Sequence, residues 1–159
     1  MGVVIWKKGV MSDLSIATHW RGVYAYDRTP NDLAELYADT EFDMQLALGW
    51  FGRFTGRIID AEPGIMEPAT IRGRATKSRI SFLKKYTSLW VIDESGTLSI
   101  VPGQPSYILY YDGDFFENRD RIKGKWQIRA ETRWINEAQW DFPAFSGTWT
   151  AQSCIQRPK

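Results

Sequence analysis

Short segments of this chain alternate large apolar residues with polar ones at every second position, which is typical of β-strands with one buried face. In the clearest segment, 122–131, Ile, Gly, Trp, Ile and Ala interleave with Lys, Lys, Gln, Arg and Glu. The same period predicts further strands over 19–26, 42–48, 53–60, 69–75, 80–86, 109–113 and 145–151. About eight main strands with short connections and almost no helical pattern predict an all-β fold. One short run, Leu33 to Tyr37, is compatible with a single helical turn.

An up-and-down antiparallel β-barrel of about eight strands explains these segments best, because a closed sheet has no exposed edges. A β-sandwich is the alternative, since alternation with period two does not distinguish a closed sheet from two packed sheets. We expect one barrel domain over 19–153, an N-terminal extension over 1–18 and a C-terminal tail over 154–159. Because the barrel pattern begins only at His19, Met11 is an alternative start of the chain.

The segment 90–101 predicts an extra hairpin that eight barrel strands do not need. Two apolar runs, 90–92 and 97–101, flank the turn-forming sequence Asp-Glu-Ser-Gly. Exposed apolar side chains of this kind indicate a partner or a second copy of the chain. A hairpin folded back over the barrel explains them equally well. The candidate interface residues are Trp90, Ile92, Leu98 and Ile100.

The chain is rich in aromatic residues, with eight Trp, seven Tyr and eight Phe. Many of them share the inward face of their strand with a glycine, which makes room for a bulky neighbour and lets the strand coil. An eight-stranded barrel has the size at which side chains either fill the interior or leave space for one small ligand. The sequence leaves both alternatives open.

Two ionisable residues, Asp60 and Lys84, fall on inward faces, where an unpaired charge is costly. As functional groups they would anchor the polar end of a ligand while aromatic walls bury the remainder. The alternative is that both lie near strand ends, where Lys84 extends its ammonium group to water. The candidate ligand-binding residues are Trp20, Tyr24, Tyr26, Asp60, Phe82, Lys84, Tyr86, Tyr111 and Trp126.

A family resemblance rests on a succession of spaced Trp, Gly and Tyr residues. It comprises Trp20-x-Gly22-x-Tyr24-x-Tyr26, Phe54-x-Gly56, Glu67-Pro68-Ala69-Thr70-Ile71-x-Gly73, Ile80-x-Phe82-x-Lys84-x-Tyr86, Tyr111-x-Gly113 and Ile122-x-Gly124-x-Trp126. This succession resembles a group of uncharacterised bacterial proteins with small calycin-like barrels of the avidin and lipocalin type. The resemblance covers His19 to Gln152 and implies a fold without implying a mechanism.

Better-known calycins fit less well. Lipocalins carry Gly-x-Trp on the first strand, whereas here Gly147-x-Trp149 lies on the last one. The polar residues with which avidin-like barrels contact biotin have no counterparts that can be placed on this chain. Nitrobindin-like barrels hold haem through a histidine, and His19, the single histidine, is predicted to point outward.

The single cysteine, the net charge and an acidic loop indicate no further kind of site or partner. Cys154 is the single cysteine, which excludes an internal disulfide and a cysteine metal cluster. A net charge of +1 gives no overall attraction to nucleic acid or anionic lipid, and we expect neither partner. The acidic loop that contains Asp112, Asp114, Glu117, Asn118 and Asp120 lacks the spacing of an EF-hand and is read as solvated.

A set of basic residues is predicted to face outward on neighbouring strands. Binding of RNA to such a set would require exposed aromatic residues between the charges, and the aromatic residues mostly point inward. A solvated barrel exterior is therefore the favoured interpretation. The set comprises Arg53, Arg57, Arg72, Arg74, Lys77, Arg79 and Lys85.

The pattern as a whole favours a non-enzymatic, cytoplasmic barrel that binds a small, largely apolar ligand with a polar tip. No catalytic, cofactor or metal signature accompanies it. The competing hypothesis is a solid-cored barrel that acts through its surface or as a homodimer built on the 90–101 hairpin.

Overall fold

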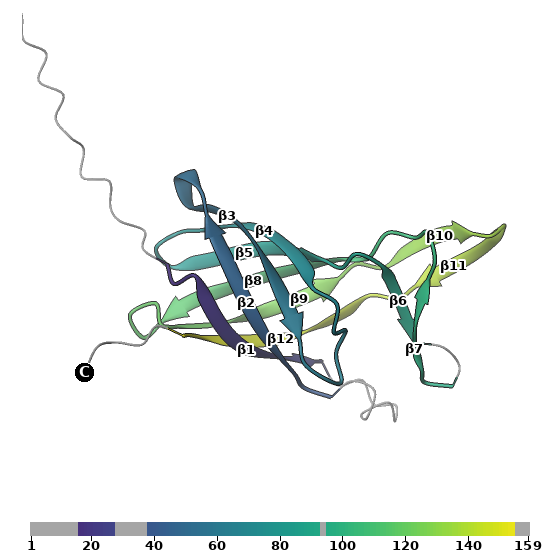
Figure 1. Cartoon of the computed structure of the whole chain (residues 1–159), viewed down its shortest axis with the longest axis horizontal. Coiled ribbons are helices and arrows are strands. Elements are labelled where there is room, and N and C mark those ends of the chain that lie inside the picture. The colour runs from purple at the N-terminus through teal and green to yellow at the C-terminus, as the bar shows by residue number, and fades with distance from the viewer. Residues whose placement is uncertain (1–15, 28–37, 93–94, 155–159) are drawn as a thin grey trace, which may run out of the picture.

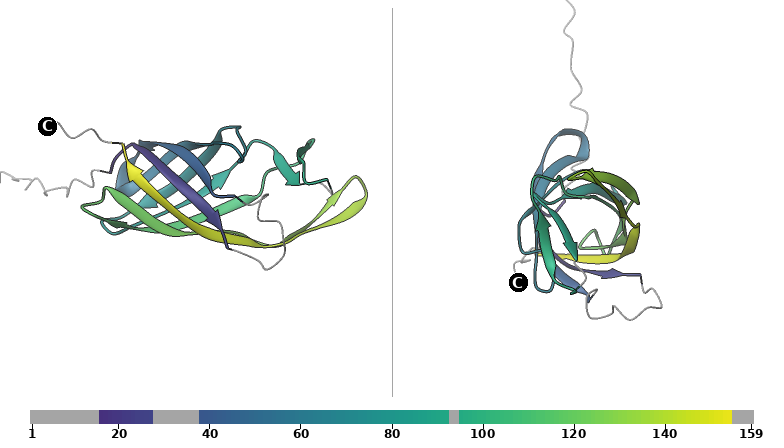
Figure 2. Two further views of the ribbon diagram at one scale, coloured as in Figure 1. Left: turned by 90° about the horizontal axis from the view of Figure 1, so that it is seen from below. Right: turned by 90° about the vertical axis from the view of Figure 1, so that its right-hand side faces the viewer.

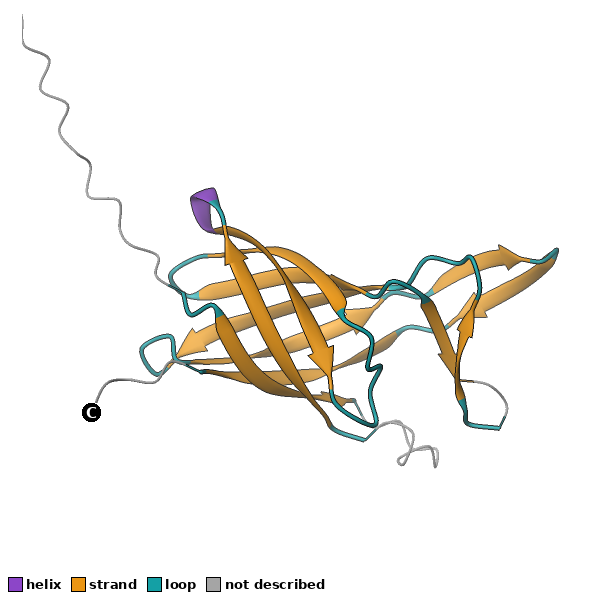
Figure 3. Cartoon of the chain, in the orientation of Figure 1, coloured by secondary structure: helices purple, strands orange, loops and turns teal. Residues whose placement is uncertain are grey.

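Eight antiparallel strands close into a barrel in the computed structural model, which describes residues 16–27, 38–92 and 95–154. The strand order around the barrel is β1-β12-β9-β8-β5-β4-β3-β2, so barrel strands that follow one another along the chain are neighbours (Figures 1 and 3). The predicted up-and-down barrel is confirmed, and the β-sandwich alternative is wrong. The predicted helical turn over 33–37, Met11, and most of the predicted extension and tail lie outside the described residues.

The barrel strands match the segments that the alternation predicts, with boundary differences of one or a few residues. They are β1 (His19–Tyr26), β2 (Thr40–Leu48), β3 (Arg53–Asp60), β4 (Ala69–Ala75), β5 (Arg79–Lys85), β8 (Ile108–Phe116), β9 (Arg121–Ile128) and β12 (Phe145–Ser153). A single 3₁₀ turn, η1 (Trp50–Gly52), joins β2 to β3.

Two hairpins are inserted at the same end of the barrel, which we call the hairpin end (Figure 2). The predicted hairpin, β6 (Leu89–Ile92) with β7 (Leu98–Val101), follows β5. A second one, β10 (Glu131–Ile135) with β11 (Ala138–Phe142), prolongs β9 and β12 beyond the barrel. The alternation did not predict this second hairpin, because it ran β9 on to Glu131 without a break. Both hairpins contribute to a small second core of Leu89, Ile135 and Phe142.

Aromatic rings occupy the middle of the barrel interior. Phe82 and Tyr111 stack with their ring centroids 4.8 Å apart, and the Trp149 ring lies 5.5 Å from each of them. Glycine makes this packing possible, because a Cβ atom on Gly124 would lie 2.7 Å from Nε1 of Trp149 and one on Gly147 would lie 2.6 Å from Nε1 of Trp126. The rings therefore lie directly on the backbone of neighbouring strands, as expected for a filled interior.

The buried indole groups of Trp126 and Trp149 have backbone partners. Trp126 donates to the carbonyl oxygen of Ala25 at 3.1 Å, and Trp149 donates to that of Asp112 at 3.1 Å. Because a buried N–H without a partner costs free energy, these bonds fix the large rings at specific positions.

Candidate functional site

Four polar side chains meet inside the barrel near the hairpin end, and we call them the Asp60 cluster: Tyr24, Asp60, Lys84 and Tyr86. Asp60 is the last residue of β3, Lys84 is the last inward residue of β5, and Tyr86 follows that strand directly. Tyr24 comes from β1, on the other side of β2 from Asp60. The even-position alternation turns each of these side chains inward, and the closure of the barrel brings them together.

The centre of the cluster is a buried ion pair. The Lys84 Nζ donates to both carboxylate oxygens of Asp60, each at 2.8 Å, and both side chains are inaccessible to solvent, at 1% and 0% exposure. The expectation that Lys84 extends to water is therefore wrong. Strands β4 and β8 flank β5 on its two sides, and the residues paired with Lys84 in the sheet register are Ile71 on β4 and Leu109 on β8.

Tyrosine hydroxyls complete the coordination of the carboxylate. Tyr86 donates a short hydrogen bond to Oδ2 of Asp60, while the Tyr24 hydroxyl lies 3.4 Å from the same atom. Both rings also face the ammonium group, with Nζ 5.1 Å from the centroid of Tyr24 and 4.8 Å from that of Tyr86. Ser106, which is buried, accepts from the backbone N–H of Tyr86 at 3.1 Å and fixes that residue.

Burial dominates the electrostatics of the cluster. It lowers the pKa of Lys84 below the ordinary lysine value, and the attraction of Asp60 opposes this shift. Burial and the nearby Asp60 carboxylate together raise the pKa values of Tyr24, Tyr86 and Tyr111 well above the ordinary tyrosine value. At neutral pH the hydroxyls of Tyr24 and Tyr86 keep their hydrogens and direct them to Asp60.

The cluster has unused hydrogen-bonding capacity. An ammonium group carries three hydrogens, and two of them bond to Asp60. Among the described residues, the third ammonium hydrogen of Lys84 has no hydrogen-bond acceptor, and only the ring faces of Tyr24 and Tyr86 lie near it. The hydroxyl oxygen of Tyr24, 3.4 Å from Oδ2 of Asp60, is further away than in an ordinary O–H···O hydrogen bond, so this contact is weak.

Around the cluster, the hairpin end is lined by partly buried apolar side chains that pack against the barrel core: Tyr26, Ile65, Trp90, Tyr107, Ile128 and Phe145. Trp90 is a special case among them. Its Nε1 is buried and, in the described part of the chain, has no hydrogen-bond partner. Buried N–H groups are nearly always hydrogen-bonded, so this indole group is available as a donor to a ligand acceptor.

The other predicted ligand-binding residues all lie on inward faces, but not in one place. Tyr24 and Tyr26 contact Trp126, with ring centroids 6.0 and 4.8 Å away. Phe82 and Tyr111 lie in the filled middle of the barrel, whereas Trp20 packs on Phe115 near the opposite end. The structure therefore joins Tyr24, Tyr26, Asp60, Lys84, Tyr86 and Trp126, and it leaves Trp20 apart.

The four predicted interface residues divide between two faces. Trp90 turns onto the barrel core, as expected of a hairpin folded back over the barrel. The other three stay accessible, with exposures of 40% for Ile92, 37% for Leu98 and 47% for Ile100. Trp134 and Trp140 of the unpredicted hairpin are also exposed, and the alternation gave no indication of them.

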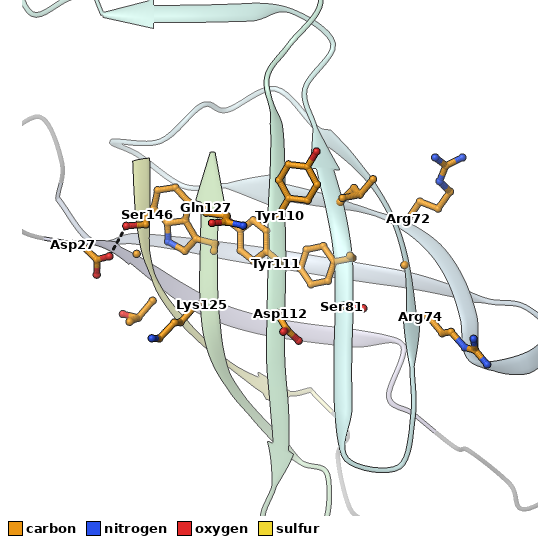
Figure 4. Close-up of a pocket in the computed structure, with 16 residues that line it drawn as sticks. Asp27, Arg72, Arg74, Ser81, Tyr110, Tyr111, Asp112, Lys125, Gln127 and Ser146 are labelled. Atoms are coloured by element: carbon orange, nitrogen blue, oxygen red, sulfur yellow. Dashed lines mark hydrogen bonds between the residues drawn. The ribbon is translucent and has the colours of Figure 1, made fainter. Parts of the chain in front are cut away.

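Two hollows lie on the outer wall rather than in the interior, since the side chains that line them are mostly outward ones. One, of about 700 Å³, extends over β4, β5, β8, β9 and β12 and includes Arg72, Arg74 and Lys125 (Figure 4). The other, of about 890 Å³, extends over β2 to β5 and includes Arg57 and Lys85.

The single histidine and two acidic residues that the sequence singled out form ion pairs or hydrogen bonds on the outer surface. His19 lies on the outer face, as predicted, with Nε2 2.7 Å from Asp43. The acidic loop was predicted to include Asp112 and Asp114, but both lie within strand β8, where they pair with Arg79. The described residues include no group of three or more His, Cys, Asp or Glu side chains placed to hold a metal ion. Nor do they include a helix long and apolar enough to cross a membrane.

Comparison with known proteins finds no significant match to this chain among protein-family models, curated sequences or solved structures.

Proposed function

We propose that this protein is a non-enzymatic binder of a small, neutral, largely apolar molecule that carries a hydrogen-bond acceptor, held at the hairpin end of the barrel. The observation that carries the proposal is the fully buried Lys84–Asp60 pair with its two tyrosine hydroxyls. A buried ion pair seldom adds stability over apolar residues of the same volume, so its presence is better explained by recognition than by packing.

The charge of the cluster supports a neutral ligand. Asp60 cancels the charge of Lys84, so that a carboxylate or phosphate on the ligand would add an uncompensated buried charge. A carbonyl or ether oxygen instead accepts from the unused ammonium hydrogen or from Tyr24, whose present bond is long. The Trp90 N–H offers a second donor.

The aromatic packing supports the hairpin end, rather than the centre of the barrel, as the binding position. Stacked rings of Phe82, Tyr111 and Trp149 fill the middle. Partly buried apolar side chains gather between the cluster and the hairpins, where Tyr26 and Phe145 are in ring contact. Apolar walls with a few convergent polar groups are typical of small-molecule sites.

A calycin-like relationship, proposed from the spaced Trp, Gly and Tyr residues, is consistent with this position. Supporting it are the eight-stranded up-and-down order and the inward location of Trp20, Tyr24, Phe82 and Trp126. The mouth of a β-barrel is one of the places where small-molecule sites preferentially occur.

Titration with prodan, a neutral naphthalene fluorophore that carries a carbonyl acceptor, tests the proposed function. We expect saturable binding with blue-shifted emission, weakened about threefold to tenfold by Tyr24→Phe, because one hydrogen bond is lost. The matched control is Tyr110→Phe on the outer face of β8, which should bind like the wild type. Absence of a saturable emission change, or equal effects of the two variants, would contradict the proposal.

A second candidate is a solid-cored barrel that acts as a homodimer through the β6–β7 hairpin. The exposed Ile92, Leu98 and Ile100 favour it. Native mass spectrometry separates the two candidates: a monomer that retains a small molecule supports the ligand site, whereas a bare dimer that Ile100→Ser dissociates supports the surface.

A further inference from the structure

The outer wall formed by β3, β4 and β5 carries basic side chains and no acidic ones. Side chains at the outward positions of these three strands include six exposed basic residues: Arg53, Arg57, Arg72, Arg74, Arg79 and Lys85. Of these, Arg79 pairs with Asp112 and Asp114 on β8. Among the described residues, the other five form no ion pair, and Arg57 donates instead to the amide oxygen of Gln45.

Two arginines on this wall stand directly opposite one another. Arg53 and Arg74 are cross-strand partners of β3 and β4, and like charges in that relation destabilise a sheet. Repulsion between these unpaired cations thus lowers the stability of the fold. A bound polyanion would neutralise the cations and remove this repulsion. The open hollow of about 890 Å³ on the same wall includes Arg57, Arg72 and Lys85.

An aromatic tip lies at one end of the cationic wall. The η1 turn between β2 and β3 projects from the barrel (Figures 1 and 3), with Trp50 76% exposed and Phe51 84% exposed. Phe51 has a positive φ of 57°, which is unfavourable for a bulky residue. Gly52 adjoins the backbone of Ala75 and anchors the turn beside β4, while Arg53 follows immediately.

We propose that this wall and tip bind single-stranded nucleic acid, as an activity additional to the proposed ligand site. The cations contact successive phosphates, and two bases stack on Trp50 and Phe51, the combination that sequence-tolerant single-strand binders use. Alternate residues on a strand are about 7 Å apart, so Arg53 and Arg57 span roughly 13 Å of chain. The sequence pattern disfavoured RNA binding because most aromatic residues were predicted to point inward. Trp50 and Phe51 are instead exposed.

The layout favours a linear polyanion over an anionic membrane. A flat lipid surface that receives the tip would contact Arg53 and Arg74, yet Arg57 and Lys85 lie further along the wall, away from it. A single strand that follows the wall contacts all five unpaired cations. The overall net charge of +1 leaves this attraction local to one face.

Fluorescence anisotropy with labelled fifteen-nucleotide oligothymidine and oligouridine tests the proposal. With about five phosphates neutralised, the slope of log K against log salt concentration should be about −3.5, or roughly a hundredfold loss from 50 to 200 mM salt. The Arg72→Gln/Arg74→Gln variant should reduce the slope to about −2. The Trp50→Ala/Phe51→Ala variant should weaken binding about tenfold or more, with little change of slope.

The matched control is Lys123→Gln/Lys125→Gln, which removes two exposed lysines from the outer face of β9. Circular dichroism verifies that each variant is folded. Absence of binding at 50 mM salt, or an equal loss in the β9 control, would overturn the proposal. Binding to phosphatidylserine vesicles through Trp50 and Phe51 without binding to either oligonucleotide would also overturn it.

Discussion

Lys84 is held inside the barrel by its partners, not by any access to water. Its ammonium group has a carboxylate 2.8 Å away and two tyrosine rings beside it, and the side chain is 1% exposed. Removing one member of such a pair leaves an uncompensated charge in the interior. The residues of the Asp60 cluster are therefore coupled, and single substitutions overstate what each one contributes.

Double substitution should reveal this coupling. We expect Lys84→Met and Asp60→Asn each to lower the free energy of unfolding by about 3–5 kcal/mol, because each leaves its partner charged and buried. The double variant Asp60→Asn/Lys84→Met should lie within about 1–2 kcal/mol of the wild type, since no charge remains and the amide oxygen that replaces the carboxylate still accepts from the tyrosines. Urea denaturation measures all four proteins, and additive losses would show that the pair is not coupled.

The buried tyrosines predict an alkaline limit to stability. The pKa values of Tyr24, Tyr86 and Tyr111 are raised in the folded state, whereas tyrosine in the unfolded chain titrates near pH 10. Above pH 10 the folded state thus binds more protons than the unfolded state, so stability falls as the pH rises. Absorbance of tyrosinate at 295 nm should show these three tyrosines ionising only together with unfolding. Their ionisation in the folded barrel would contradict the prediction.

The strand period predicts where the residues of the cluster point but not which of them meet. Asp60 and Lys84 were separate candidates, 24 positions apart on strands that are not neighbours. Their contact depends on barrel closure, which brings β3 and β5 within reach across β4. Alternation contains no information on closure or on side-chain reach, and for that reason Lys84 was also compatible with a solvent-facing position.

At the scale of elements, the two hairpins act as one unit. On β6, Leu89 is fully buried against Ile135 and Phe142 of the other hairpin, while Trp90 turns to the barrel core. Each hairpin has only two strands, which is marginal for independent stability. Their shared core of three buried residues therefore holds both in place.

Truncation of that core should loosen both hairpins and spare the barrel. We expect Leu89→Ala to speed amide hydrogen exchange in β6, β7, β10 and β11, because truncation of this buried side chain leaves a cavity in the core that the two hairpins share. Exchange in β3 and β4 should be unchanged. Faster exchange throughout the barrel would indicate that the hairpins and the barrel unfold as one.

The β10–β11 hairpin shows where sequence patterns fail at this scale. Its turn residues, Asn136 and Glu137, both have positive φ, at 49° and 65°, as a two-residue type I′ turn requires. Asn at the first position is a recognisable signal, but Glu at the second is not. The flanking strands also lack alternation, since all of β11 except Phe142 is exposed.

At the scale of the whole molecule, the barrel separates two kinds of surface. Inward rings and the Asp60 cluster form a closed interior with partly buried apolar residues at the hairpin end. Outward cations gather on β3 to β5, near an aromatic tip. The alternation predicted both sets of side-chain directions, and the barrel was predicted because a closed sheet has no exposed edges. The inward glycines indicated room for large rings, but whether the rings fill the centre stayed open, because their packing depends on strands distant in sequence.

The most direct test of the ligand site is the ¹H–¹⁵N NMR spectrum of the tryptophan indole groups during a prodan titration. The Trp90 resonance, assigned by its loss in Trp90→Phe, should move downfield as its unpaired N–H gains an acceptor. The Trp149 resonance should stay in place, because its N–H is bonded to the carbonyl oxygen of Asp112. A stationary Trp90 resonance at saturating prodan, or shifts only in residues of the outer wall, would contradict ligand binding at the hairpin end.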